Sequence, residues 1–99
     1  PYCTAAIGLD SQAITSWATD QEVSFIDYAD LVAHPEVRKL IVSAITSVNR
    51  QLPSYEQVRE FILMAEEPSV ENGLLTPTQK IKRGVVEKQY KNELNSLYP

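Results

Sequence analysis

Three cations lie close together in the C-terminal third of the chain, at Lys80, Lys82 and Arg83. A helix is predicted from about Thr78 to Leu97, which places all three in or near its first turn. The helix macrodipole is positive there, so each cation costs roughly 0.3–1 kcal/mol and acids are the usual residues. An incoming anion would offset that cost, because free N–H groups at a helix start favour phosphate. The pattern indicates a phosphate-facing segment; ordinary solvated side chains are the alternative.

The segment before this helix is predicted to be a loop. Asn72-Gly73 is a strong turn signal, because both residue types tolerate positive φ. Pro77 stiffens the loop, and Thr78 is the expected N-cap of the helix, its hydroxyl accepting a free backbone N–H.

Two strands are predicted earlier in the chain. Period-2 alternation from Tyr2 to Leu9 is typical of a strand. The run Val58–Met64 is short and rich in β-branched and apolar residues, which predicts a second strand covered on both faces. The stretch 69–75 is expected to add a third, edge-type strand segment.

Three helices are predicted before the last one. The first is capped by Asp10 or Ser11, a short second helix is capped by Asp27, and a long third helix begins at His34-Pro35, where Pro suits the first helical position. The long helix carries an apolar stripe at helical spacing that is predicted to be core: Val37, Leu40, Ile41, Ala44, Ile45, Val48 and Leu52. Together the elements predict a small α+β domain, with a two- to three-stranded sheet packed with three to four helices.

The composition describes an ordinary globular domain. The 99 residues are 43% hydrophobic and 22% charged. The net charge of −4 provides no basic field for nucleic acid or an anionic membrane. No apolar run approaches the roughly 18 residues that a membrane helix needs. The class of partner is therefore expected to exclude nucleic acid, and no membrane-spanning segment is predicted.

No complete catalytic set can be assembled from the sequence. The single histidine, His34, excludes a metal site of several histidines, and no metal ligands are predicted. The single cysteine, Cys3, excludes an internal disulfide, fits a reducing cytoplasm and is expected to pack in the apolar strand. Glu66 and Glu67 are adjacent acids in a loop, which predicts solvated charge. If the chain belongs to an enzyme, its substrate pocket lies elsewhere.

The segment ENGLLTPTQKIKR, residues 71–83, resembles the C-terminal end of AMP-forming long-chain fatty-acid–CoA ligases, in the adenylate-forming enzyme superfamily. Weaker matches follow in the family's order: YCTAAI at 2–7, the helix with Trp17, HPEV at 34–37, and YEQV and FIL within 55–63. The resemblance covers the whole chain, and the segment 71–83 is its most specific part.

The resemblance implies that residues 1–99 are most of the small C-terminal lid domain of such a ligase. The chain is expected to be a fragment whose large N-terminal domain and hinge precede it, and to be inactive alone. Lys80 occupies the position of the family's C-terminal-domain lysine, a catalytic residue that bridges the acyl carboxylate and the nucleotide α-phosphate. The residues that the resemblance places in the phosphate-proximal loop are Gly73, Thr76, Thr78, Lys82 and Arg83.

The chain departs from the family's pattern at two positions. Many relatives carry Gly directly before the lysine, whereas this chain has Gln79, so its loop is expected to lack the positive-φ freedom of Gly and to run differently. Leu74 stands where some relatives have Glu, so no polar role is assigned to it.

The function that the resemblance implies is a two-step ligation. ATP and a fatty acid give an acyl adenylate and pyrophosphate with the help of Mg²⁺, and the CoA thiol then displaces AMP. ATP and Mg²⁺ would be bound mainly by the N-terminal domain, which is the expected partner of this one. The lid would rotate between the steps and withdraw Lys80. The expected location is cytoplasmic, or peripheral to a membrane in the full-length protein.

Two other functions stay open at the level of sequence. One is a stand-alone interaction module without a catalytic role, docking through Ile81 and Val85 on the front of the last helix. The other is a small phosphate or nucleic-acid binder using Lys80, Lys82 and Arg83, against which the acidic balance argues.

Overall fold

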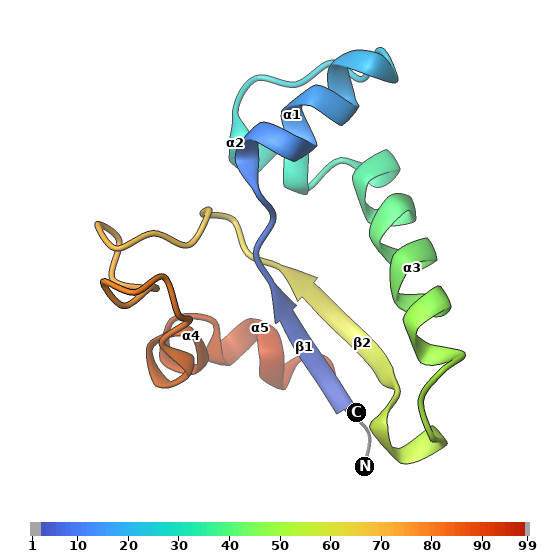
Figure 1. The fold of residues 1–99 in the computed structure, drawn as a ribbon, viewed down its shortest axis with the longest axis vertical. Coiled ribbons are helices and arrows are strands. Elements are labelled where there is room, and N and C mark those ends of the chain that lie inside the picture. The colour runs from blue at the N-terminus through green and yellow to red at the C-terminus, as the bar shows by residue number, and fades with distance from the viewer. Residues whose placement is uncertain (1–2, 99) are drawn as a thin grey trace.

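The computed structural model describes residues 3–98, so the expected strand residue Tyr2 lies outside the described part. The elements in chain order are β1 (Cys3–Ile7), α1 (Ser11–Asp20), α2 (Tyr28–Val32), α3 (Pro35–Asn49), a 3₁₀ turn (Ser54–Glu56), β2 (Val58–Leu63), α4 (Arg83–Gln89) and α5 (Lys91–Asn95) (Figure 1). The fold class is α+β, as predicted.

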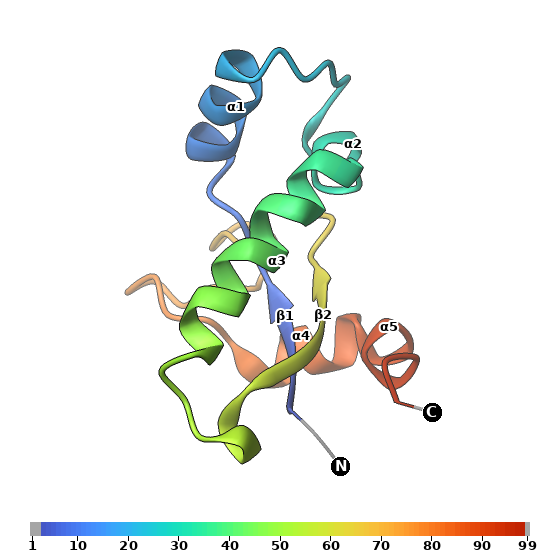
Figure 2. The same cartoon turned by 90° about the vertical axis from the view of Figure 1, so that its right-hand side faces the viewer.

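The sheet consists of β1 and β2, which run parallel, with register partners from Thr4↔Glu60 to Ile7↔Leu63. The long helix α3 lies on one side of the sheet, and α4 and α5 lie on the other (Figures 1 and 2). A parallel pair requires a crossover connection, and α1, α2 and α3 provide it.

The helix starts follow from local capping. The Asp10 carboxylate accepts the Ala13 N–H at 2.9 Å, and the Asp27 carboxylate accepts the Asp30 N–H at 2.8 Å. At α3 the His34 ring nitrogen Nδ1 accepts a backbone N–H, and a proline follows at the first helical position. These three predicted starts are confirmed, because each depends on side chains within three residues of the cap.

Apolar side chains form two clusters. The first joins α1, α2 and α3 through the buried residues Ile14, Ala18, Leu31 and Val37. The second joins the loop after β2 to α4 and α5 through Met64, Leu74, Val86 and Tyr90. The second cluster holds the cation-bearing segment, because fully buried Leu74 lies at its base.

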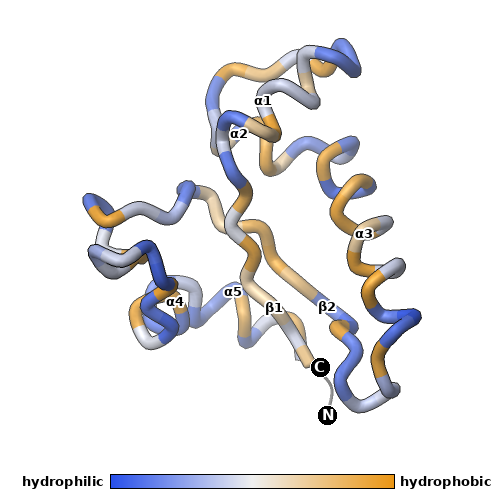
Figure 3. Tube along the Cα trace, viewed as in Figure 1, coloured by the Kyte–Doolittle hydropathy of each residue, from blue (hydrophilic) through white to orange (hydrophobic). Residues whose placement is uncertain are grey.

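The prediction that the whole α3 stripe is core is wrong. Only Val37 of α3 is buried, and Val48 near the other end is 58% exposed. The second half of the helix instead borders an open groove of about 320 Å³, lined by Val42 and Ile45 of α3 and by Val58 of β2. Figure 3 shows that the exposed half still carries hydrophobic residues. That half is held by Asn49, whose side chain bonds both the N–H and the carbonyl of Val58 at the start of β2.

Two further predictions are corrected. Within residues 3–98 the stretch 69–75 forms no strand; its only ladder contact is an isolated antiparallel bridge between Leu75 and Ile81. Cys3 is exposed at the beginning of β1, where its thiol donates to the Tyr55 carbonyl at 3.4 Å, so it has no packing role. The β2 prediction is confirmed, although Arg59 and Glu60 are exposed and the strand is not covered on both faces.

Tyr28 fastens the junction between β1 and α1. Its hydroxyl donates to the Leu9 carbonyl at 2.8 Å and accepts from the Leu9 N–H at 3.1 Å. Burial raises the pKa of this hydroxyl above its ordinary value of 10.0, and the negative charges of Glu67 and Asp10 act in the same direction. Because the folded state holds the proton more tightly than the unfolded state, this stabilisation is complete below pH 10 and is lost as pH rises through the folded pKa.

We therefore expect Tyr28→Phe to lower the free energy of unfolding at pH 7 by about 1–3 kcal/mol, since the two part-buried Leu9 groups lose their partner. Denaturant unfolding from pH 7 to pH 12 measures the effect. The difference in the free energy of unfolding between the native chain and the variant should shrink above pH 10. A constant difference over that range would contradict the role given to the neutral hydroxyl.

Candidate functional site

The cation-bearing segment is a short hairpin. The Thr76 N–H donates to the Lys80 carbonyl at 2.8 Å, and the Lys82 N–H donates to the Leu74 carbonyl at 2.8 Å. Leu75 and Ile81 face each other between these two bonds. This is the pattern of a non-hydrogen-bonded antiparallel pair.

The tip of the hairpin is a three-residue loop. The Gln79 N–H donates to the Thr76 carbonyl at 2.8 Å, which closes a β-turn with Pro77 at its second position. Gln79 then adopts a φ of 67°, in the left-handed region. A turn followed by one left-handed residue is a common three-residue hairpin connection.

The predicted start of the last helix is wrong. The helix α4 begins at Arg83, with Lys82 at the N-cap position and no side-chain capping bond. The hydroxyl of Thr78 contacts the Thr76 hydroxyl at 3.1 Å and caps no helix. Residues 78–82, which the sequence predicts as the first turn of the helix, instead form the tip and the returning side of the hairpin. Lys80 therefore lies outside the helix, and the argument from the macrodipole does not apply to it.

The last helix is also interrupted at Tyr90, which separates α4 from α5. The two helices still share one apolar face, since Val86 and Tyr90 are buried and Leu94 packs against them. Ile81 is 51% exposed and Val85 is 40% exposed, so neither belongs to this buried face.

The expectation that this loop lacks a residue at positive φ is wrong, because Gln79 has a φ of 67°. A non-glycine residue in the left-handed region costs about 1–3 kcal/mol and persists only where the surroundings fix it. The bonds across the hairpin on either side of Gln79 supply that constraint. The loop therefore adopts with glutamine the conformation that glycine favours.

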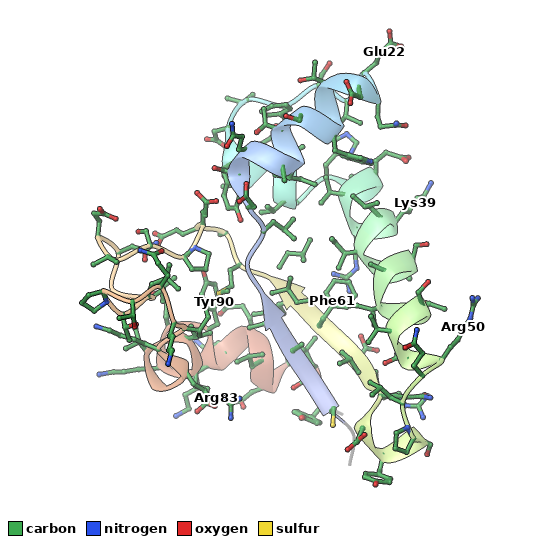
Figure 4. The ribbon with its side chains drawn as sticks, viewed as in Figure 1. Glu22, Lys39, Arg50, Phe61, Arg83 and Tyr90 are labelled. Carbon is green, nitrogen blue, oxygen red and sulfur yellow. The ribbon has the colours of Figure 1, made fainter. Side chains whose placement is uncertain are left out.

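Lys80 is exposed, and its ammonium pairs with no acid in the part of the chain that the structure describes. Within the described residues the sole ion pair joins Lys39 to Glu36, at 3.3 Å on the outer side of α3. The Lys80 side chain is therefore available to a group outside this domain. Arg83 is exposed at the start of α4 (Figure 4). It lines an open groove of about 640 Å³ with Ile81 and with Thr4, Ala5 and Ala6 of β1.

The base of the hairpin is fastened by Asn72. Its side-chain oxygen accepts the N–H groups of Ser69 at 3.0 Å and Leu74 at 3.1 Å, and its amide nitrogen donates to the Glu67 carbonyl at 2.8 Å. Gly73 follows with a φ of 81°, which confirms the predicted Asn-Gly turn. Sequence reasoning found the turn but not these bonds.

Glu67 links the same loop to α1. Its carboxylate accepts the Ser11 N–H at 2.6 Å and the Ser11 hydroxyl at 2.9 Å. An acid at this helix N-terminus complements the macrodipole. The prediction that Glu67 is merely solvated charge is therefore wrong. The residues lie 56 positions apart, and no local pattern indicates the contact.

The model of one protein family matches residues 23–99, and its description is AMP-binding enzyme C-terminal domain. The chain belongs to this family. The C-terminal domain is 34% identical over 101 residues to long-chain-fatty-acid–CoA ligase 1 of Cavia porcellus, covering 98% of the chain and 14% of that protein. It is 33% identical over 91 residues to long-chain-fatty-acid–CoA ligase 6 of Homo sapiens, covering 90% of the chain and 13% of that protein.

A plant relative extends the comparison. Long chain acyl-CoA synthetase 6, peroxisomal, of Arabidopsis thaliana is 31% identical over 96 residues, covering 95% of the chain and 14% of that protein. The C-terminal domain thus spans about 14% of the length of such relatives. No solved structure matches it. These findings confirm the resemblance seen in the sequence.

The residues predicted for the site all lie within residues 73–83 of the C-terminal domain. Gly73 lies at the hairpin base, Thr76 and Thr78 at the tip, and Lys80 and Lys82 on the returning strand. Leu74, given no polar role, is fully buried. Among residues 3–98 no three metal-ligating side chains come together, and no helix there is long and apolar enough to span a membrane.

Proposed function

We propose that this C-terminal domain is the lid of an AMP-forming long-chain fatty-acid–CoA ligase, and that Lys80 is its catalytic residue. The large N-terminal domain and the hinge would belong to the same polypeptide. The observation that carries the proposal is an exposed ammonium, without an acidic partner among the described residues, on a hairpin whose backbone is hydrogen-bonded across both sides. The printed names of the relatives, as CoA ligases and acyl-CoA synthetases, support the reaction.

The first step needs a positive charge at the reacting atoms. A carboxylate oxygen of the fatty acid attacks the α-phosphorus of ATP, and pyrophosphate leaves with the electron pair of the broken P–O bond. Two anions must approach each other, and charge accumulates on the phosphoryl oxygens in the transition state. A preorganised ammonium in a water-excluded site offsets both effects by several kcal/mol. Lys80 suits this role, since lysine carries a compact charge on a flexible stem.

In the second step the CoA thiol attacks the acyl carbonyl and AMP departs. Lys80 is not needed there, so the lid would turn and withdraw it, as in other hinge-closure enzymes. Mg²⁺ would neutralise phosphate charge in the first step, bound mainly by the N-terminal domain. Exposed Ile81 and Val85 would face that domain, with Lys82 and Arg83 adding positive potential. A cytoplasmic or membrane-peripheral location stays a prediction.

The test of the proposal is an exchange assay on the full-length polypeptide. Fatty-acid-dependent exchange of pyrophosphate into ATP should be present in the whole protein and absent when residues 1–99 are removed. The 99-residue chain alone should show no exchange. Undiminished exchange without this domain would refute the lid assignment, and exchange independent of fatty acid would refute the substrate class.

A further inference from the structure

The hairpin geometry leaves one backbone group of Lys80 without a main-chain partner. In a bulged hairpin two successive residues face a single residue of the opposite strand, so their N–H groups compete for one carbonyl. Here the Gln79 N–H takes the Thr76 carbonyl at 2.8 Å. The Lys80 N–H instead donates to the Thr76 hydroxyl oxygen at 3.1 Å.

Thr76 consequently holds both main-chain polar groups of Lys80. Its N–H donates to the Lys80 carbonyl at 2.8 Å, and its hydroxyl accepts the Lys80 N–H. The Lys80 side chain is exposed, and the neighbouring Ile81 is 51% exposed, so packing does little to fix this residue. The Thr76 hydroxyl oxygen also lies 3.1 Å from the Thr78 hydroxyl, which restrains its orientation.

We propose that Thr76 is the positioning residue of the adenylation step, whose hydroxyl fixes the backbone from which Lys80 reaches the reacting phosphate. The inference rests on the proposed function of Lys80. It deepens that function by assigning a role to a hydroxyl that need not touch the substrate. Any shift of the Lys80 backbone is carried to its ammonium, and a misplacement of about 1 Å costs on the order of a hundredfold in rate.

The test uses the full-length polypeptide and two substitutions at one position. Thr76→Val keeps the shape and the backbone N–H but removes the hydroxyl, whereas Thr76→Ser retains the hydroxyl. Thr19→Val is the matched control, because exposed Thr19 also uses its hydroxyl to bond a backbone carbonyl, that of Thr15 at 3.0 Å. The kcat and KM for acyl-adenylate formation are measured beside thioester formation from preformed acyl adenylate.

Thr76→Val should lower the kcat for adenylation by about ten- to a hundredfold. Thioester formation and the KM for ATP should stay within about threefold, because a transition-state interaction is lost rather than ground-state binding. Thr76→Ser should recover most of the rate, and Thr19→Val should match the native enzyme. Thr76→Ala repeats the comparison if the valine variant folds poorly.

Native-like adenylation in both Thr76→Val and Thr76→Ala would overturn the inference. So would a serine variant as slow as the valine variant, or an equal fall in both half-reactions. Lys80→Ala separates this failure from that of the proposed function. If Lys80→Ala abolishes adenylation while Thr76→Val does not, only the role of Thr76 is refuted. If Lys80→Ala is fully active, the catalytic assignment itself fails.

Discussion

Replacing Lys80 by alanine in the full-length polypeptide is expected to lower fatty-acid-dependent ATP–pyrophosphate exchange by at least about a hundredfold. The ammonium is unpaired within the described domain, so its loss removes no internal ion pair and should leave the fold intact. Thioester formation from preformed acyl adenylate should stay within about threefold of the native rate, because the crowded phosphate oxygens arise only in the first step.

Lys39→Ala provides a matched control for removing one exposed lysine charge. Lys39 lies on α3, and its side chain is 75% exposed beside Glu36. Neither half-reaction should change in this variant, since an exposed ion pair contributes little to stability. Equal losses in both half-reactions of Lys80→Ala would show that the lysine acts on folding or domain docking instead of on charge in the transition state.

The parts of the fold that sequence predicts well are those fixed by neighbours along the chain. Asp10, Asp27 and His34 each cap a helix through atoms two or three residues ahead. The two strands follow from their residue types, and the Asn72-Gly73 turn follows from the need for positive φ at Gly73. Such signals are complete within a few residues, so no knowledge of the fold is needed to interpret them.

The parts that sequence misses depend on what a segment meets in space. Apolar periodicity places the α3 stripe on one face, but whether that face is covered depends on how closely other elements pack against it. The contact of Glu67 with Ser11 joins residues 56 positions apart. Neither the exposure of Val48 nor the capping role of Glu67 can therefore be derived from local pattern.

The candidate site contains features of both kinds, some predicted from sequence and some missed. Family resemblance predicted Lys80 as the catalytic residue, and its side chain, exposed and without an ion pair among residues 3–98, is compatible with that proposal. The argument from the helix macrodipole does not hold for Lys80, because the helix starts at Arg83 and only Lys82 and Arg83 lie at its N-terminus. Hairpin pairing between Thr76 and Lys80 overrode helix propensity, which is a weak preference that tertiary contacts commonly override.

Gln79→Pro is expected to have the second largest effect on the enzyme. Proline fixes φ near −65°, whereas this position requires 67°, and proline lacks the N–H that closes the turn onto Thr76. The tip of the hairpin must then rearrange and carry the Lys80 backbone with it. We expect adenylation to fall by about a hundredfold, and the free energy of unfolding to fall by more than about 1 kcal/mol.

Gln79→Gly is the control that separates backbone conformation from side-chain chemistry. Glycine adopts positive φ without steric cost, keeps the N–H bond to Thr76 and lacks the glutamine side chain. Exchange activity should stay within about threefold of native. The free energy of unfolding should be unchanged or raised by up to about 1 kcal/mol, because the backbone strain relieved in the folded state outweighs the greater flexibility that glycine gives the unfolded chain. If the glycine variant were as slow as the proline variant, the glutamine side chain would be the functional group. The left-handed backbone would then be incidental to the placement of Lys80.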